Sequence, residues 1–147
     1  MRDTQALVKE FHEAFGLAID QPVTRDTFEL RASLLEEEMT EVREAVEEFN
    51  GLLYRPAYDQ QPSQEELDES FGNLRKELAD LRYVIDGLMV SFGVDSYRDI
   101  RIVHGNNMSK LGEDGQPIRR FDGKILKPKG FKKITGKDLG SSVQYDL

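Results

Sequence analysis

The stretch LLEEEMTEV, residues 34–42, lies at the centre of a long segment without glycine or proline and decides the fold. At about 100° per residue its apolar side chains return at helical spacing, which predicts a helix from near Thr27 to Phe49. Asn50-Gly51 is a typical helix stop. Within this helix Glu38 falls inside the apolar arc, where a solvated surface would not place a carboxylate.

A second long helix repeats this arrangement. The sequence Ser63-Gln64-Glu65-Glu66 has the form of a capping box, so it predicts a helix that starts there and runs to Phe92, before Gly93. Glu77 falls within the apolar arc of this helix, and Asp80 lies just outside it. Two long helices therefore each carry a carboxylate on the face that should be buried.

These acidic groups indicate a divalent cation. An ionised carboxylate on a buried face costs several kcal/mol unless it is paired, and several of them repel one another. The nearby cations Arg43, Arg75 and Arg82 point away from this face. All-oxygen ligation favours Mg²⁺, with Mn²⁺ as a possible substitute. A merely solvated acidic surface is the alternative reading of such a charge run. The expected ligands are Glu38, Glu41, Glu77 and Asp80.

The rest of the chain predicts one domain over its 147 residues. Helical spacing and turn signals predict two further helices, over residues 4–15 and from Asp95 to Met108. The fold class is all-α: a bundle of four to five helices, the helical body covering residues 1–110. Residues 111–147 form an irregular arm rich in Gly and Pro, with a short hairpin candidate around Asp122-Gly123.

Charge and composition exclude several classes of protein. The net charge is −8, which argues against a general nucleic-acid binder. Residues 1–108 carry 11 Lys/Arg and 23 Asp/Glu, a net −12, whereas the remaining residues have a net +4. We expect no signal peptide and no membrane span. The absence of cysteine excludes thiol chemistry and fits a reducing compartment, so we expect a cytoplasmic protein.

The two acidic segments resemble a family motif. Glu37-Glu38-Met39-Thr40-Glu41, followed by Glu77-Leu78-Ala79-Asp80, is similar to the EExxE…ExxD signature of the all-α NTP pyrophosphohydrolases, which include the MazG-like proteins and the dimeric dUTPases. Residues 8–16 are similar to the opening helix of a MazG-like subgroup. Residues 104–111, with Asn107-x-x-Lys110, and residues 122–127 are similar to its C-terminal segments.

This resemblance implies Mg²⁺-dependent hydrolysis between the α and β phosphates of a nucleoside triphosphate, giving a nucleoside monophosphate and pyrophosphate. The expected role is sanitation of the nucleotide pool, with dUTP as the leading substrate. The alternatives are dCTP, a modified (d)NTP or phosphoribosyl-ATP. Glu37, beside the metal ligands, is the candidate to orient or deprotonate the attacking water, and the alternative for it is a supporting role next to the ligands.

Substrate contacts are expected from two parts of the chain. The motif match makes Asn107 and Lys110 candidates for binding sugar or phosphate oxygens. Lys127 belongs to a basic segment that either guides polyphosphate or pairs with the acidic helices of a partner subunit. Base recognition needs an apolar wall with a few directed hydrogen bonds. The candidates for base contact are Phe11 and His12, with a structural role as the alternative for His12, whereas Tyr83 either contacts the ribose or packs against a neighbour.

Two further expectations concern assembly. The apolar arcs are longer than a chain of this size covers alone, so we expect a homodimer or a dimer of dimers. The competing hypothesis is a non-enzymatic helical interaction module, in which the acidic arcs form a dimer surface and the basic arm docks on them. Such a module would show no thermal stabilisation by metal.

Overall fold

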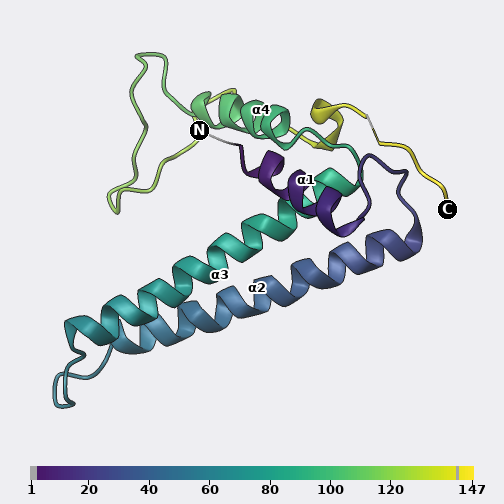
Figure 1. Ribbon diagram of the computed structural model, residues 1–147. Coiled ribbons are helices and arrows are strands. Elements are labelled where there is room, and N and C mark those ends of the chain that lie inside the picture. Colours follow the sequence, from purple (N-terminus) through teal and green to yellow (C-terminus); the bar gives the residue numbers. More distant parts are fainter. Residues whose placement is uncertain (1–2, 142) are drawn as a thin grey trace. The chain divides into compact units, whose positions relative to one another are not determined.

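A computed structural model describes residues 3–141 and 143–147, and all regular structure in these residues is helical. The fold is thus the predicted all-α class, built around two helices of 29 and 28 residues. The elements are α1 (Thr4–Phe15), α2 (Arg25–Leu53), α3 (Gln64–Ser91), α4 (Ser96–Met108) and a short 3₁₀ helix η1 (Gly136–Leu139) (Figure 1).

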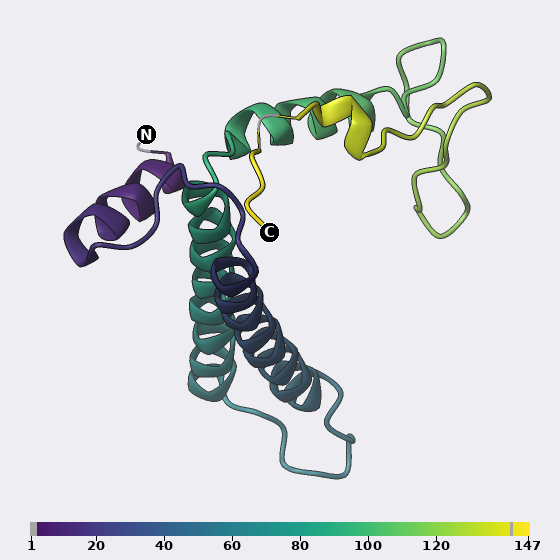
Figure 2. The same cartoon turned by 90° about the vertical axis from the view of Figure 1, so that its right-hand side faces the viewer.

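Helices α2 and α3 lie side by side as an antiparallel pair, joined by the loop of residues 54–63 (Figures 1 and 2). Their buried and half-buried positions recur at intervals of seven residues, as in a coiled-coil seam. Many of these positions are polar or small, so the pair has a narrow core. One such series is Arg31, Glu38 and Ala45 on α2, and Ser70, Glu77, Val84 and Ser91 on α3; half-buried apolar residues lie beside it, among them Leu34, Val42, Phe49, Leu74 and Leu81.

The ends of these helices can be compared with the capping box and the helix stop that the sequence predicts. Ser63 and Glu66 form the predicted capping box, since the Ser63 hydroxyl accepts from the Glu66 N–H and the Glu66 carboxylate accepts from the Ser63 N–H. The predicted stop of α2 at Asn50-Gly51 is wrong, because the helix continues to Leu53. A helical glycine costs about 1 kcal/mol relative to alanine. Half-burial of Leu52 on the same helix offsets that cost.

Helix α1 packs against the C-terminal half of α3. Val8 is fully buried, and its side chain approaches Gly87, where a Cβ would lie 3.9 Å from Val8 Cγ1. One turn along each helix, the rings of Phe11 and Tyr83 meet edge to face at 5.8 Å. Gly16, with φ of 65°, ends α1 in the left-handed conformation that favours glycine. This packing fixes an aromatic cluster beside α3.

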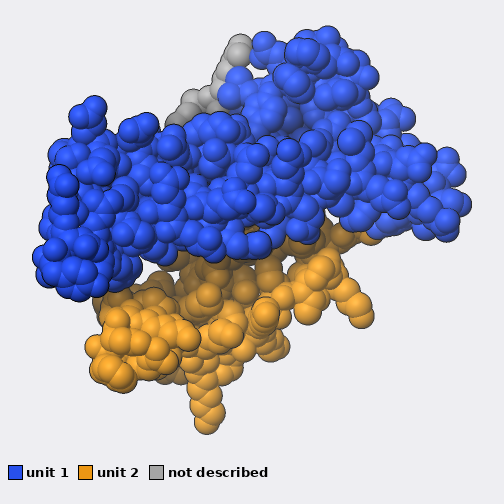
Figure 3. Space-filling view, turned by 90° about the horizontal axis from the view of Figure 1, so that it is seen from below, with its two compact units in different colours: residues 1–94, 143–147 blue, residues 95–142 orange. Residues whose placement is uncertain are grey.

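The chain forms two compact units (Figure 3). Unit 1 contains residues 1–94 and 143–147, and unit 2 contains residues 95–142. The C-terminal segment joins unit 1 through a parallel bridge between Val23 and Tyr145. In unit 2 the predicted hairpin is present as a single antiparallel bridge between Arg119 and Ile125 around the Asp122-Gly123 turn, and no strand is formed in the described residues.

Candidate metal centre

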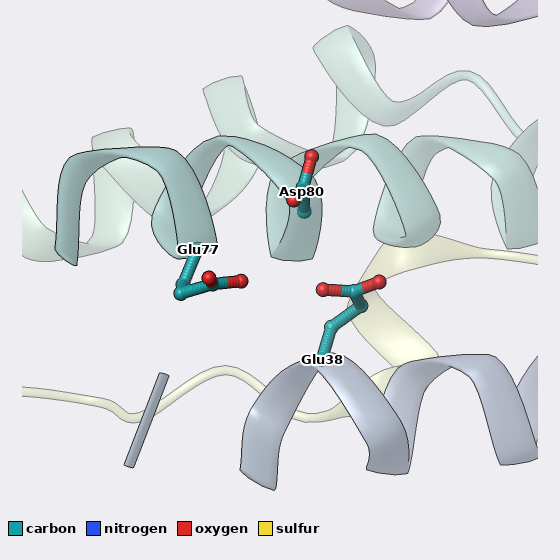
Figure 4. Close-up of side chains that lie close together, drawn as sticks. All are labelled: Glu38, Glu77 and Asp80. Atoms are coloured by element: carbon teal, nitrogen blue, oxygen red, sulfur yellow. The ribbon is translucent and has the colours of Figure 1, made fainter. Parts of the chain in front are cut away.

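Three carboxylates from α2 and α3 converge at the middle of the helix pair. Glu38 projects from α2 toward Glu77 and Asp80 on α3, and one oxygen of each lies within 4.8 Å of the others (Figure 4). Glu77 and Asp80 are three residues apart, so a single helix face presents both. All three side chains are half-buried. The predicted convergence of acidic groups from the two helices is therefore present.

Glu38 has a side-chain oxygen whose hydrogen-bonding capacity is unsatisfied. Its Oε2 atom is buried and has no hydrogen-bond partner. Burial is the main cause that raises the pKa of Glu38, and the nearby negative charge of Asp80 raises it further. A carboxylate without water or a donor is costly, and an added cation would relieve both the desolvation and the repulsion.

The remaining two acids of the first segment lie differently. Glu41 is half-buried, and a hydrogen bond with the Glu77 carboxyl is the main cause that raises its pKa. This places Glu41 beside Glu77 but outside the three carboxylates whose oxygens lie within 4.8 Å of one another, and its role as a metal ligand stays a prediction. Glu37 is exposed on α2. It neighbours Glu38 in the chain, and its assignment as the group that activates water stays a prediction.

Sequence reasoning missed a cation at this site. The ammonium group of Lys76 lies 3.2 Å from Glu77 Oε2 and 2.9 Å from Asp80 Oδ2. Its hydrogen bonds to Asp80 and Glu77 raise the pKa of Lys76 above its usual value. The spacing of four residues between Lys76 and Asp80 was the available signal. Lys76 is largely exposed, so it neutralises the acids from the solvent side and leaves the buried Glu38 oxygen unpaired.

The donors present fit a hard divalent cation. Within the described residues, the cluster offers carboxylate oxygens only, with no histidine or cysteine among them. Such a set suits Mg²⁺ or Mn²⁺, which retain water and substrate phosphates in the remaining positions. The orphaned oxygen of Glu38 is a ready ligand position. The arrangement can hold a cation between the two antiparallel helices α2 and α3.

The expected base-binding side chains gather on α1 and α3. Phe11 stacks on Phe15, with ring centroids 4.3 Å apart, and meets Tyr83 edge to face. His12 is 2% exposed, and its Nδ1 donates to the carbonyl of Ala18 at 2.8 Å. That bond favours a structural role for His12, whereas Phe11 and Tyr83 are partly open to solvent. Contact of any of these residues with substrate stays a prediction.

A second cation that the sequence analysis missed is Arg31. It is 7% exposed, and its Nε is buried without a hydrogen-bond partner. Burial lowers the pKa of Arg31. It lies seven residues before Glu38 on the same helix face, and this interval was the signal that could have found it.

The other expected substrate residues belong to unit 2. The Lys110 ammonium group donates to the Asn107 side-chain oxygen at 2.9 Å, as their spacing of three residues on one helix end allows. Lys110 and Lys127 both lie over the ring of Phe131, at 5.9 and 5.7 Å from its centroid. The structure thus brings these three predicted residues, Asn107, Lys110 and Lys127, into one neighbourhood of unit 2.

Comparison with known proteins decides the family. The sequence model of phosphoribosyl-ATP pyrophosphohydrolase matches residues 8–107, which include α1, α2, α3 and most of α4. The chain belongs to this family. The family is part of the all-α MazG-like NTP pyrophosphohydrolase superfamily, so the resemblance in the two acidic segments is confirmed. No curated protein matches the chain.

Family membership supports an enzyme rather than an interaction module. The chain is a metal-dependent nucleotide pyrophosphohydrolase, and the three-carboxylate cluster lies within the matched residues. No helix in the described part of the chain is long and apolar enough to cross a membrane.

Proposed function

We propose that this pyrophosphohydrolase uses Mg²⁺ to cleave the bond between the α and β phosphates of a nucleoside triphosphate, releasing a nucleoside monophosphate and pyrophosphate. The observation that carries the proposal is the convergence of Glu38, Glu77 and Asp80 around a buried, unpartnered carboxylate oxygen. Polyphosphate is itself strongly negative, so it approaches such a cluster only together with cations.

Each acidic residue has a distinct part in this proposal. Glu38, Glu41, Glu77 and Asp80 hold Mg²⁺, which when bound neutralises phosphate charge and promotes ionisation of water. Glu37, exposed next to Glu38, takes the proton of the attacking water. The i,i+3 pair on α3 and the residues on α2 fix the ligands on rigid helices, which keeps them in place before substrate arrives.

For the substrate we propose dUTP first, because the acidic segments are similar to those of the dimeric dUTPases. Phosphoribosyl-ATP is the second candidate, and the description of the matching family favours it. Phe11 and Tyr83 would meet the base in unit 1, and the buried His12 would support them from behind. Asn107, Lys110 and Lys127 would meet sugar and phosphate oxygens. The lack of cysteine suits a reducing cytoplasm. We propose that the enzyme works there in sanitation of the nucleotide pool.

The deciding experiment measures pyrophosphate release from a panel of dUTP, dCTP, the other (d)NTPs and phosphoribosyl-ATP with Mg²⁺ or Mn²⁺. We expect turnover of one pyrimidine deoxynucleotide, dUTP first, and none in EDTA. Turnover of phosphoribosyl-ATP alone would replace dUTP as the substrate. If no member of the panel releases pyrophosphate with either metal, the proposed activity is wrong.

Variants connect the activity to the carboxylates. Glu38→Gln and Asp80→Asn should abolish turnover and also the stabilisation by metal, which is about 2.7 kcal/mol at a hundredfold excess over Kd. Glu44→Gln, on the exposed side of α2, is the matched control and should behave as the unaltered protein. Equal loss in all three variants would show that general destabilisation, and not ligand removal, explains the effect.

We also propose that the working form is a homodimer or a dimer of dimers. Only four apolar residues are buried in the described chain, while many large apolar side chains of α1, α2 and α3 stay exposed. Monomeric proteins seldom leave this much apolar surface open. The exposed positions include Phe15, Phe28, Met39, Val46, Phe71, Leu78 and Ile85.

A further inference from the structure

Unit 2 contains a pocket that the metal centre does not involve. Its volume is about 520 Å³, and it lies between the end of α4 and the loop of residues 128–134. The family match ends at residue 107, so most of its lining lies outside the matched segment. Among the lining side chains are Lys129, Phe131 and Lys132, with Asn106 on the helix side.

Hydrogen bonds hold the two walls of this pocket in place. The Phe131 N–H donates to the Pro128 carbonyl at 3.1 Å, which closes a tight turn. Gly130 within that turn has φ of 85°, a conformation that favours glycine. The Asn106 side-chain amide donates to the Lys132 carbonyl at 2.7 Å and ties the loop to α4. The pocket is therefore built by anchored segments of the chain.

Two lysines line this pocket against one carboxylate, and two more lie next to one of its lining residues, Phe131. Lys129 and Lys132 line it, and Lys110 and Lys127 lie over the Phe131 ring. None of these four lysines takes part in an ion pair among the residues that the structure describes. Their like charges repel one another, and an anion placed between them would remove the repulsion. The opposing acid in the lining is Glu113.

We propose that this pocket binds a polyphosphate group, such as the triphosphate of a nucleotide, without the help of a divalent metal. Several ammonium groups can bond separate phosphate oxygens, and a chain of phosphates matches their number better than a single phosphate does. Lys110 and Lys127 make cation–π contacts with the ring of Phe131, which lines the pocket, and add positive charge near it. The proposal rests on Lys129 and Lys132, which line the pocket and have no part in the proposed activity, so it stands on unit 2 alone.

The test is calorimetric titration of the full chain with inorganic tripolyphosphate in EDTA. Without metal the cluster of Glu38, Glu77 and Asp80 repels phosphate, so binding under these conditions reports the basic pocket. We expect binding that weakens steeply with salt. The double variant Lys129→Gln/Lys132→Gln should bind about tenfold more weakly or worse, as the loss of charge-assisted hydrogen bonds predicts. We expect dUTP to bind about as tightly as tripolyphosphate, because the phosphates carry recognition.

Two controls separate this site from the metal centre. Lys124→Gln removes an exposed lysine that does not line the pocket and should leave binding in EDTA unchanged. Glu38→Gln should keep this binding even though it loses metal-dependent turnover. The proposal is overturned if tripolyphosphate does not bind in EDTA, if the double variant binds as the unaltered chain does, or if only nucleotides bind.

Discussion

At the scale of single residues, Glu38 determines the chemistry of the centre. A helical wheel places it in an apolar arc, and the structure gives it a buried oxygen with no partner and a raised pKa. The spacing of four residues between Lys76 and Asp80 was the signal for a neutralising group, but only the structure shows how the flexible Lys76 side chain turns over the α3 surface to reach both Glu77 and Asp80. At this site the carboxylate of Glu38 was predicted from the sequence, whereas the ammonium group of Lys76 that neutralises its neighbours was not.

Replacing Glu38 with Gln should stabilise the metal-free protein at neutral pH. A carboxyl with a raised folded-state pKa penalises folding once it ionises, so the penalty is complete above the folded-state pKa and disappears as pH falls from there to below the usual value of 4.5. We expect the Tm of Glu38→Gln in EDTA to exceed that of the unaltered chain by about 1–4 °C at pH 7. The difference should shrink toward pH 4.5. A lower Tm for the variant at pH 7 would contradict this.

Replacing Lys76 with Gln should tighten metal binding. The Lys76 ammonium group competes with a bound cation for Glu77 and Asp80, and its removal takes away one positive charge near the ion. Because Lys76 is largely exposed, the effect is modest, about two- to fivefold in the Kd for Mn²⁺ by calorimetry. Lys9→Gln, an exposed lysine of α1, should show no change. Weaker binding in Lys76→Gln would mean that Lys76 supports the site.

At the scale of elements, the helix starts follow local chemistry and one helix end does not. Ser63 with Glu66 fixes the beginning of α3, and Gly16 fixes the end of α1, because both signals act through hydrogen bonds within a few residues. Helix α2 passes through Gly51 in a helical conformation, since packing beyond it outweighs a weak local preference. Elements are thus predictable where the signal is local.

Gly51→Ala should stabilise the protein. Gly51 lies inside α2, and no atom lies within 4 Å of a Cβ added there. Alanine loses less conformational entropy on folding, so we expect a gain of about 0.5–1 kcal/mol and a rise in Tm of a few degrees. Gly16→Ala is the matched control: it also has open space, but its φ of 65° is strained for alanine, and Tm should fall. Equal effects of both changes would refute the helical assignment of Gly51.

At the scale of the whole molecule, the chain leaves many large apolar side chains exposed to solvent. The seam between α2 and α3 contains small and polar residues next to half-buried apolar ones, and several larger side chains of the same arcs remain exposed. The net charge likewise divides between an acidic unit 1 and a basic unit 2, with the metal cluster in the first and the lysine pocket in the second. Assembly and ligand binding are the ways in which such surfaces are covered or neutralised.

Light scattering of the purified chain should give the mass of a dimer or tetramer. Val46→Glu/Leu78→Glu places charge on the exposed apolar faces of α2 and α3 and should shift the mass toward that of the 16.8 kDa monomer. Glu44→Gln is the control and should keep the assembled mass. A monomeric unaltered chain at micromolar concentration would contradict the proposed assembly.

By itself the sequence determined the helical class, the starts of α1, α3 and α4, and the acids that meet, because periodicity and caps act over a few residues. Only the tertiary structure decided that Glu38 Oε2 is left without a partner, that Arg31 is buried and that lysines of unit 2 gather around Phe131. These features depend on which side chains distant segments bring together. The burial of a side chain and the charges around it depend on the segments packed against it, so the sequence of a single helix does not determine them.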